Sequence, residues 1–453
     1  MTRSFLLSEL QNENVMGRRL NFLVLLLFVV IAWWFAEPWA AVSLAEAEPL
    51  DAGDTAWMLV SSAFVLLMTP GLAFFYGGMV HRKHIISTML QSFVALGVVS
   101  VLWVLVGFSL CFGESLGGVI GDPRTFFAFR GVGLAPNADF AGSIPFALFA
   151  LFQLKFAIIT PALITGSLAG RIRFRSYILF MVLFSLLIYP PLAHMTWHPD
   201  GLLRQAGVLD FAGGTVVHMS AGLAAWAGAW FLGKRKPEEE EEPANIPFVI
   251  LGTGMLWFGW FGFNGGSAFA ASLDAVVAFA NTNIASATAM ITWMFYERFM
   301  DRKMSAVGAC VGAIVGLVAI TPAAGFVTIG ESMLIGFVAA LVSNFAVRAA
   351  HRSRIDDTLD VFPSHGIGGM VGMVMTALFA AEVGLVHGGG WAAFGVHIAA
   401  LIGVTLFAFS GSYGLFVVVN ALIPLRVTAE QEDRGLDLSQ HGETVRGGAG
   451  GLA

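Results

Sequence analysis

Long apolar stretches alternate with short polar connections along most of this chain. The connections are charged or rich in glycine and proline, and each apolar stretch approaches the about 20 residues that an α-helix needs to cross a bilayer. The pattern predicts an all-α polytopic membrane protein. Its eleven transmembrane helices are expected at 55–80, 85–112, 141–169, 176–195, 211–232, 247–268, 275–298, 304–322, 331–350, 364–383 and 391–424.

Positively charged residues are shared unequally between the two sides of these helices. Short cytoplasmic loops carry an excess of lysine and arginine. One alternating set of connections, with the C-terminal tail, holds seventeen of them, and the other holds only Arg124, Arg130 and Arg204. The first set is therefore predicted to be cytoplasmic, which places the N-terminus of the first helix outside and the C-terminus inside. The seventeen are Arg82, Lys83, Arg171, Arg173, Arg175, Lys234, Arg235, Lys236, Arg298, Arg302, Lys303, Arg348, Arg352, Arg354, Arg426, Arg434 and Arg446.

Composition excludes several classes of protein. Hydrophobic residues make up 57% of the chain, charged residues only 12%, and the mean hydropathy is +0.78, which is too apolar for a soluble globular protein. The net charge of −6 gives no basic field for nucleic acid. Cys111 and Cys310 both fall in apolar runs, so neither a disulfide framework nor a metal site is predicted.

Glycine is abundant, and close packing of helices in lipid depends on small residues. The glycines at i, i+4 and i+8 are therefore predicted to mark helix contact faces. They are Gly308, Gly312 and Gly316 in one helix, and Gly166 and Gly170 in another.

The N-terminus resembles a targeting segment. Arg18 and Arg19 precede "LNFLVLLLFVVIAWWFA" and then "SLAEAEP", which are the basic, apolar and small-residue parts of a secretory signal peptide. Residues 1–47 are thus predicted to be a signal peptide, or alternatively a retained N-terminal anchor. Residues 51–424 form the transmembrane domain, and 425–453 form a cytoplasmic regulatory tail. The acidic loop at 234–245 is interpreted as a solvated cytoplasmic connector.

Helices 1–5 and 6–10 have opposite predicted orientations, as an inverted repeat requires. Two local patterns support this interpretation. Asp210 precedes helix 5 with His218 farther in, and Asp360 precedes helix 10 with His365 farther in. Helix 11 is left over to brace the bundle.

His218 and His365 are the first functional candidates. Ionisable side chains within a span are costly and mark pathways more often than packing. At repeat-related positions, the two imidazoles could meet as a hydrogen-bonded and mostly neutral pair in a pore. The alternative is that both are satisfied structural histidines, which is also the interpretation of His194 and His397.

Aromatic residues provide candidates above the histidines. Phe152 and Phe156 lie one turn apart on one helix face, and Ser267 and Phe263 lie on another helix that runs the opposite way. The predicted order from the outside inward is a mouth, two phenylalanines beneath it and a histidine relay. The mouth contains Trp197, Phe152 and Ser267, the phenylalanines are Phe156 and Phe263, and the relay contains His218 and His365.

This order of side chains suits a small protonated amine. Aromatic faces hold a cation as it loses water, and a serine hydroxyl accepts a hydrogen bond from an N–H group. Deeper phenylalanines exclude water, so an ion that keeps its charge meets a steep barrier. A cation that sheds a proton avoids this barrier, and a neutral imidazole pair can relay that proton. The simpler alternative for any one aromatic pair is core packing.

The chain resembles the ammonium transporter family (Amt/Mep/Rh), on its bacterial side. The resemblance spans roughly residues 54 to 443, and several long motifs at matching spacing make it specific. The stretches that carry it are "GLAFFYGGMV", "FQLKFAIITPALITGSLAGRIRF", "AHMTW", "LDFAGGTVVHMSAG", "WFGFNGGSA", "TPAAGFV", "DVFPSHGIGGMVG" and "LRVTAEQEDRGLDLSQHGE".

The resemblance implies uptake of ammonium or ammonia across a bacterial inner membrane, by a homotrimer with one pore per subunit. It also implies an outer recruitment site at Trp197, Phe152 and Ser267, and a gate at Phe156 and Phe263. The positions of His218 and His365 match the family's twin-histidine motif, and that of Asp210 supports the outer site. The cytoplasmic face is expected to be blocked by a PII-type regulatory protein. No cofactor or metal is implied, and the function is transport, not enzymatic catalysis.

Three features depart from the family pattern. Lys155 lies mid-span, about 60° around the helix from Phe152, and is predicted to face a helix or subunit contact instead of the pore. Gly170 replaces a familiar acid, and the "WHPDG" loop is one residue longer, which could shift Trp197. Two alternative functions remain open: an ammonium sensor that conducts little, and an electron-transfer protein with a bis-histidine haem.

Overall fold

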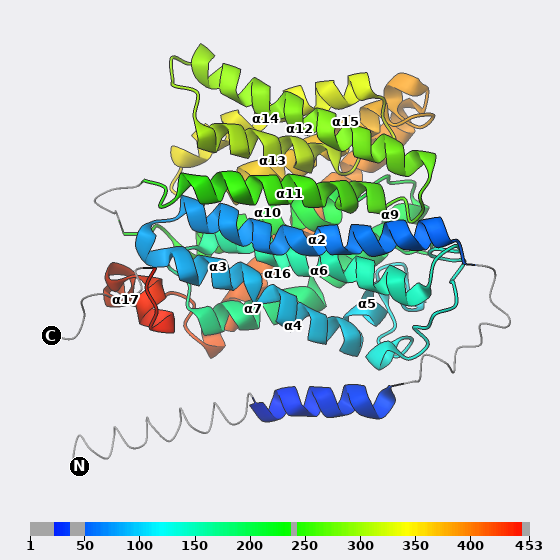
Figure 1. Cartoon of the computed structure of the whole chain (residues 1–453), viewed down its shortest axis with the longest axis horizontal. Helices are drawn as coiled ribbons and strands as arrows, with labels where there is room; N and C mark the ends of the chain where they lie inside the picture. The colour runs from blue at the N-terminus through cyan, green and yellow to red at the C-terminus, as the bar shows by residue number, and fades with distance from the viewer. Residues whose placement is uncertain (1–21, 37–49, 237–241, 446–453) are drawn as a thin grey trace.

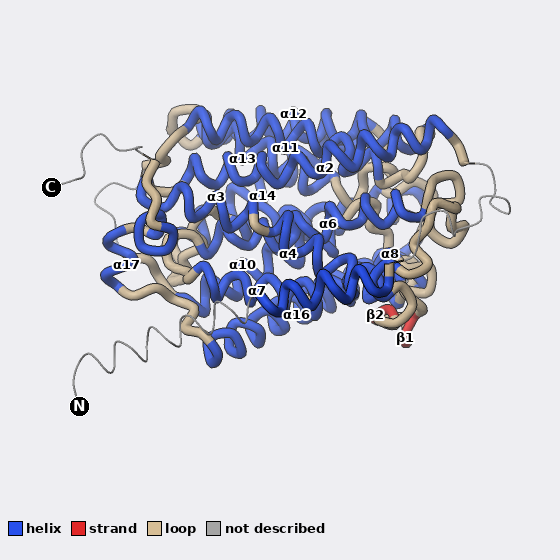
Figure 2. The backbone as a smooth tube through the Cα atoms, turned by 60° about the horizontal axis from the view of Figure 1, so that its bottom comes forward, coloured by secondary structure: helices blue, strands red, loops and turns tan. Residues whose placement is uncertain are grey.

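The structure is a computed structural model that describes residues 22–36, 50–236 and 242–445. Most of the predicted leader, at 1–21 and 37–49, and the glutamate run at 237–241 lie outside the described residues, whereas Phe22–Phe35 forms a helix. The long helices lie side by side along a common axis, and their loops gather at the two ends of the bundle (Figure 1, Figure 2).

The first half of the fold runs from residue 52 to residue 232. Its elements are α2 (Ala52–Met79), η2 (Arg82–His84), α3 (Ile85–Phe93), α4 (Ala95–Leu102), η3 (Trp103–Gly107), α5 (Phe108–Phe112), β1 (Ser115–Leu116), β2 (Ile120–Gly121), η4 (Phe127–Phe129), α6 (Phe146–Leu168), α7 (Phe174–Leu187), α8 (Tyr189–Trp197), α9 (Leu202–Gln205), η5 (Gly214–Met219) and α10 (Ser220–Leu232). The two short strands pair antiparallel and lie beside α8 at one end of the bundle (Figure 2).

The second half begins with α11 at residue 246. Its elements are α11 (Ile246–Gly266), α12 (Leu273–Phe299), α13 (Ala306–Ile320), α14 (Ile329–His351), η6 (Phe362–Ile367), α15 (Gly368–Phe379), η7 (Leu385–His387), α16 (Gly390–Leu422), α17 (Ala429–Arg434) and η8 (Asp437–His441). Polar caps mark where several of these helices start. Ser272, Ser305 and Thr328 each accept a hydrogen bond from a backbone N–H in the first turn, which would otherwise lack a partner.

The predicted spans match these helices closely. Ten helical segments of the described chain are long and apolar enough to cross a membrane, from Ala52–Met79 to Gly390–Leu422. The remaining predicted span, at 304–322, corresponds to α13, which has 15 residues. The all-α polytopic fold is confirmed, while the count of eleven and the orientation stay predictions.

Glycines bring particular helices into close contact. A Cβ added at Gly312 or Gly316 would collide with α12, at 2.6 Å from Trp293 Cβ and from the Ala285 carbonyl oxygen respectively. The predicted contact face on α13 is therefore confirmed. A Cβ added at Gly166 would likewise lie 2.6 Å from the ring of Tyr76. Gly170 differs, because it follows the end of α6 and adopts a left-handed φ of 80° in a turn.

The two halves of the fold carry their histidines on the same kind of local structure. Both η5 and η6 are π-helical turns, and they contain His218 and His365. Asp357 lies as far before His365 as Asp210 lies before His218, and Asp357 accepts a hydrogen bond from the Phe362 N–H at 2.7 Å. This corrects the predicted pairing of Asp210 with Asp360.

Asp360 fails as the counterpart of Asp210 because its carboxylate points elsewhere. Its Oδ1 lies 2.9 Å from His351 Nε2, at the end of α14. Its backbone φ of 54° is left-handed, so the chain turns sharply at this residue before η6 begins. The capping function falls to the earlier aspartate.

The C-terminal tail folds back onto the loops at one end of the bundle, which we call the tail end (Figure 1). Arg426 donates to the carbonyl oxygens of Leu232 and Lys234, both at 2.7 Å, and pairs with Glu432 at 3.0 Å. Asp437 accepts from the N–H groups of Ile86 and Ser87 at the start of α3. The tail therefore links two segments, the loop after α10 and the start of α3, that are far apart in sequence.

Candidate functional site

Asp210 shapes the backbone from which the first histidine projects. Its two carboxylate oxygens accept the N–H groups of Gly213 at 2.8 Å, Gly214 at 2.7 Å and Thr215 at 2.7 Å, and also the Thr215 hydroxyl. Gly213 has a φ of 118°, which a residue with a side chain rarely adopts. The carboxylate is thus committed to the start of η5, as expected for a supporting group.

A cavity of about 280 Å³, which we call the vestibule, opens beside this turn. One of its lining residues, Arg204, belongs to α9, which lies at the end of the bundle opposite the tail (Figure 1). Trp197 donates its indole N–H to the Asp210 carbonyl oxygen at 3.2 Å, and Arg204 donates to the Trp197 carbonyl oxygen at 2.6 Å. The Ser267 hydroxyl donates to the Phe263 carbonyl oxygen at 2.8 Å, so its own lone pairs stay available to an N–H donor. The vestibule is lined by Phe112, Phe140, Phe149, Gln153, Phe156, Thr196, Trp197, Arg204, Val208, Leu209, Asp210, Phe211, Ser267, Phe269 and Phe326.

Two stacked rings close the floor of the vestibule. Phe156 lies under Trp197, with ring centres 5.8 Å apart, and over Phe263, with centres only 4.2 Å apart. Phe263 in turn lies 5.9 Å from the ring of His218. The aromatic order expected from helix direction is therefore present in the structure.

Phe152 is placed differently from Trp197 and Ser267. Its ring is fully buried and packs 5.0 Å from Phe156, but it does not line the vestibule. It also packs against Phe269, whose φ of 55° is left-handed. Phe152 therefore lies at the depth predicted from the sequence, but Phe269 lies between its ring and the vestibule.

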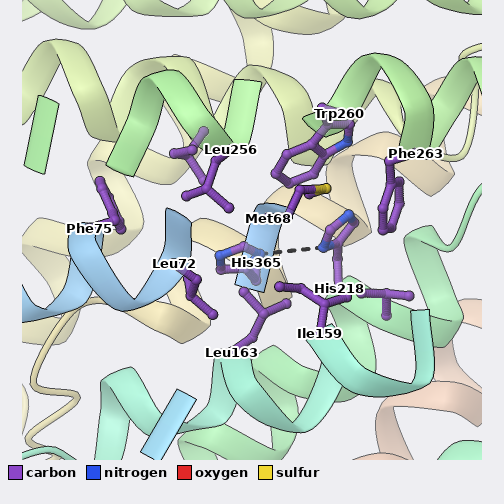
Figure 3. A pocket seen from close by; sticks show the side chains of 12 residues that line it. Met68, Leu72, Phe75, Ile159, Leu163, His218, Leu256, Trp260, Phe263 and His365 are labelled. Carbon is purple, nitrogen blue, oxygen red and sulfur yellow. Dashed lines mark hydrogen bonds between the residues drawn. The ribbon is translucent and has the colours of Figure 1, made fainter. Parts of the chain in front are cut away.

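The two histidines meet below the phenylalanines. Their Nδ1 atoms are 3.4 Å apart, their ring centres 5.4 Å apart, and their side chains are buried (Figure 3). One Nδ1 must donate and the other accept, so the pair is suited to the neutral state with two different tautomers. His218 Nε2 has no hydrogen-bond partner among the described residues.

Close backbone packing makes this meeting possible. A Cβ added at Gly222 would lie 2.2 Å from the backbone nitrogen of Gly366, so α10 and η6 touch directly. One at Gly369 would lie 2.9 Å from the Gly214 carbonyl oxygen. Four glycines thus allow the two histidine-bearing turns to approach.

The space around the histidines is narrow and apolar. It amounts to about 10 Å³, which is room for about one water molecule. Figure 3 shows the two imidazoles surrounded by aliphatic and aromatic side chains from several helices. A haem ring does not fit a space of this size, which argues against the electron-transfer alternative. The lining residues are Met68, Leu72, Phe75, Ile159, Leu163, Val217, His218, Leu256, Trp260, Phe263, Ile314 and His365.

Comparison with known proteins identifies the family of this buried pathway. The Ammonium Transporter Family matches residues 56–446. The chain belongs to the ammonium transporter family. It is 43% identical to an ammonium transporter of Aquifex aeolicus, over 89% of this chain and 96% of the relative. It is 41% identical to an ammonium transporter of Mycobacterium tuberculosis, over 87% of this chain and 90% of the relative.

Solved structures of ammonium transporter relatives agree with the fold. The crystal structure of Saccharomyces cerevisiae Mep2 matches with a TM-score of 0.77 and 36% identity, over 84% of this chain and 88% of that chain. A structure described as a sensor Amt protein matches with a TM-score of 0.80 and 30% identity, over 86% of this chain and 98% of that chain. The resemblance inferred from the motifs is confirmed.

Sequence reasoning missed a tryptophan beside the histidine pair of this ammonium transporter family member. Trp260 stacks on His218, with ring centres 5.3 Å apart and planes 21° apart, and its indole N–H donates to Thr321 Oγ1 at 2.9 Å. The signal was present, because Trp260 precedes Phe263 by about one turn on the same face of α11. Trp260 fixes the plane of the His218 ring.

The remaining predicted residues lie off the pathway. Lys155 is half-buried on α6, one turn from Leu151, which is 40% exposed, so it points out of the bundle and lines neither cavity. His194 contacts the Cys111 carbonyl oxygen at 2.9 Å and Ser115 Oγ at 2.8 Å. His397 accepts from the Leu209 N–H at 3.0 Å. Both histidines have the structural contacts that were predicted.

The loop after Trp197, which is one residue longer than the family pattern, folds into a compact turn. His198 Nδ1 accepts the Asp200 N–H at 3.1 Å, and a Cβ at Gly201 would lie 2.2 Å from the His194 carbonyl oxygen. This compact turn leaves Trp197 over Phe156.

Charged residues tie the tail end of the pathway together. The buried Arg171 donates to Thr358 Oγ1 at 2.7 Å and to the Ser167 and Asp356 carbonyl oxygens. Burial lowers the pKa of Arg171 to about 10. Asp356 also pairs with Arg235 at 2.8 Å. These contacts fix the loops before α7, after α10 and before η6 in one arrangement.

Proposed function

We propose that the chain transports ammonium across a membrane through the path from the vestibule to the histidine pair. Family membership and the relatives named ammonium transporters support transport as the function. One observation carries the mechanism: two buried imidazoles joined through Nδ1 lie in a narrow apolar space directly beneath a closed aromatic stack.

In this mechanism, the cation is recruited among Trp197, Phe156 and the Ser267 hydroxyl. Aromatic faces and one oxygen replace part of its water. The space below cannot stabilise a bare charge, because its walls are apolar and hold about one water. The cation therefore gives up a proton near Phe156 and Phe263, and neutral ammonia passes the gate. The imidazole pair accepts and passes on the proton.

Replacing both imidazoles tests this function. Purified protein in liposomes on a solid-supported membrane is expected to give a transient current after an ammonium concentration jump. The His218→Ala and His365→Ala double variant, which leaves the vestibule intact, is expected to lose at least about 90% of that current, since a general acid–base group contributes about 100-fold or more. A full current from the double variant would remove the relay from the mechanism.

Assembly, regulation and location are part of the proposal. Large apolar side chains are exposed on α11, α12 and α14, including Phe258, Phe295 and Phe345, which suits lipid or subunit contacts. We propose a homotrimer in a bacterial inner membrane. A PII-type regulatory protein would bind the tail end, where the folded tail borders the loops of several helices. Native mass spectrometry of the purified protein would test the trimer.

A sensor that conducts little is the second candidate. The fold matches a structure described as a sensor Amt protein, and the docked tail offers a surface that could change with the state of the pore. The same current measurement separates the two functions. A sensor would bind ammonium in a fluorescence titration while giving almost no steady flux in liposomes.

A further inference from the structure

A cavity of about 180 Å³, which we call the side cavity, lies between the ends of α12 and α14 and the start of α13. These three helices pack together along one side of the bundle (Figure 1). Tyr296, Arg302 and Arg348 line the side cavity. None of its lining residues lines the vestibule or the space around the histidines, so it is a separate site.

Arg348 is held in the side cavity with part of its hydrogen-bonding capacity unused. Its Cζ atom lies 4.9 Å from the centre of the Tyr296 ring, and its Nη2 donates to the Tyr296 hydroxyl at 2.6 Å. Its Nε donates to the Asn344 carbonyl oxygen at 3.4 Å. Its Nη1 has no hydrogen-bond partner among the described residues and is not sealed from solvent, since the residue is only half-buried. Two N–H groups of a fixed cation are thus available to a ligand.

The charges around the side cavity favour an anion. The second arginine of its lining, Arg302, is exposed and, like the first, forms no ion pair within the described residues. The lining also includes two carboxylates, which already have partners. Glu297 accepts the Ser305 N–H at 2.9 Å, and Asp360 lies 2.9 Å from His351 Nε2. The neighbouring helix ends carry more positive than negative residues, namely Arg298, Lys303, Arg352 and Arg354 against Asp301.

The side cavity lies at the depth of the lipid headgroups. It is at the ends of α12 and α14, both of which are long enough to cross the apolar core of a bilayer. Trp293 and Tyr296 line it, and these two residue types are enriched at membrane–water interfaces. Phe295, Phe299 and Phe345 on the same two helices are more than 60% exposed. They provide an apolar surface beside the cavity.

We propose that the side cavity binds the phosphate of an anionic phospholipid, with Arg348 and Arg302 as its donors and the acyl chains along the exposed phenylalanines. Arginine binds phosphate with paired N–H groups, and basic pockets between transmembrane helices hold lipid headgroups in this way. A zwitterionic lipid fits less well, because its choline ammonium is repelled by the same arginines. The proposal does not rest on ammonium transport, since it concerns the membrane-spanning fold alone.

The test measures lipid binding to the purified full-length protein in detergent by native mass spectrometry. Phosphatidylglycerol and phosphatidylcholine with identical acyl chains are titrated, and the affinity for the first lipid per subunit is compared. The wild type is expected to prefer phosphatidylglycerol about threefold or more. Arg348→Gln is expected to lower the affinity for phosphatidylglycerol about tenfold, as the loss of a charged hydrogen bond would, and to remove most of the preference.

Two further variants complete the test. Arg302→Gln is expected to act in the same direction with a smaller effect, and it provides a second measurement if Arg348→Gln does not fold. Arg298→Gln is the matched control, because it removes a cation from the same end of α12 but does not line the side cavity. Its side chain is 67% exposed, so the affinity for phosphatidylglycerol is expected to stay within about twofold of the wild type.

Three outcomes would overturn the proposal. The first is a wild type that binds both lipids equally, or arginine variants that keep its preference. The second is displacement of phosphatidylglycerol by an excess of inorganic phosphate, which has the headgroup chemistry without the acyl chains and would indicate a site for a soluble anion. The third is an Arg348→Gln variant that loses its oligomeric state while its lipid binding is unchanged, which would assign this face to a second copy of the chain.

Discussion

At the scale of single residues, Asp357 is a buried carboxylate with few hydrogen-bond partners. One carboxylate oxygen accepts the Phe362 N–H at 2.7 Å, and the other has no partner among the described residues. Burial, with a smaller effect of nearby Asp360, raises the pKa of Asp357 from 3.8 to about 6. The folded protein therefore binds this proton at a higher pH than the unfolded chain does.

Asp357 is expected to make stability depend on pH. Its stabilising contribution is fully present below about pH 4 and is lost as the pH rises through about 6. Asp357→Asn removes this loss, which corresponds to about 3 kcal/mol. In detergent, the variant should unfold at a higher temperature than the wild type at pH 7.5 and at a similar temperature near pH 4. The same difference at both pH values would contradict the assignment.

At the scale of elements, the contact between His218 and His365 depends on two π-helical turns held against each other by glycines. The i to i+5 pattern of a π-helical turn widens the helix and changes the direction of the side chains that follow. An aspartate at the start of each turn binds the exposed N–H groups. The histidine contact is thus a property of two helix starts as much as of two side chains.

A methyl group between the two turns should separate the histidines. Gly222→Ala would put a Cβ 2.2 Å from the Gly366 backbone nitrogen, and neither backbone can yield without moving its helix. We expect a loss of about 1–3 kcal/mol in unfolding free energy and a marked loss of ammonium current. Thermal unfolding and liposome currents measure the two effects.

Gly254 on α11 provides the matched control. A Cβ at Gly254 meets nothing within 4 Å. Gly254→Ala should preserve the current and stabilise its helix by up to about 1 kcal/mol. If both variants behave alike, the close approach of α10 and η6 has no special part in the site.

The depth of each side chain in the membrane follows from the direction of its helix and from the rise per residue. This part of the site can therefore be predicted from the sequence. That reasoning orders Trp197, Phe156, Phe263 and His218 along the path. Rotation around each helix is harder to predict, since it depends on which neighbours pack where. The ring of Phe152 therefore lies behind the vestibule wall, and Trp260 emerges as a partner of His218 only in three dimensions.

The fold, too, has features that the sequence predicts and features that it does not. Apolar runs predict the spans to within a few residues, because a bilayer imposes their length. The pairing of Asp210 with Asp357 instead of Asp360 depends on a left-handed residue and on hydrogen bonds to N–H groups four and five residues away. Neither feature is visible in the hydropathy of the sequence. However, Asp210 and Asp357 each lie eight residues before their histidine, and this equal spacing could have identified them as a pair.

At the scale of the whole molecule, the tail end is held by contacts between distant segments. Arg426 joins the loop after α10 to the tail through two carbonyl oxygens and Glu432, whose side chain is only 4% exposed. Lys236 reaches the same tail through Asp433 at 2.6 Å, but both side chains of this pair are more than 40% exposed. Exposed ion pairs contribute little because water screens them.

Removing Arg426 should therefore loosen the tail, while removing Lys236 should not. Arg426→Ala leaves the buried carboxylate of Glu432 without its ion-pair partner, although Glu432 still accepts the Lys236 backbone N–H at 2.8 Å. Hydrogen–deuterium exchange is expected to quicken at least about tenfold across α17 in this variant, which corresponds to about 1.4 kcal/mol of opening free energy. Lys236→Ala should stay within about twofold of the wild type. Equal protection in both variants would show that other contacts hold the tail.

The vestibule lining has a consequence for how the protein would respond to salinity. Its formal charges cancel, since Arg204 and Asp210 are the only charged residues among the described ones that line it. Dissolved electrolyte screens long-range attraction between charges, and the lining itself contributes almost none. Capture of the cation would depend on short-range contacts alone, so it should proceed about equally well in fresh water and in brine.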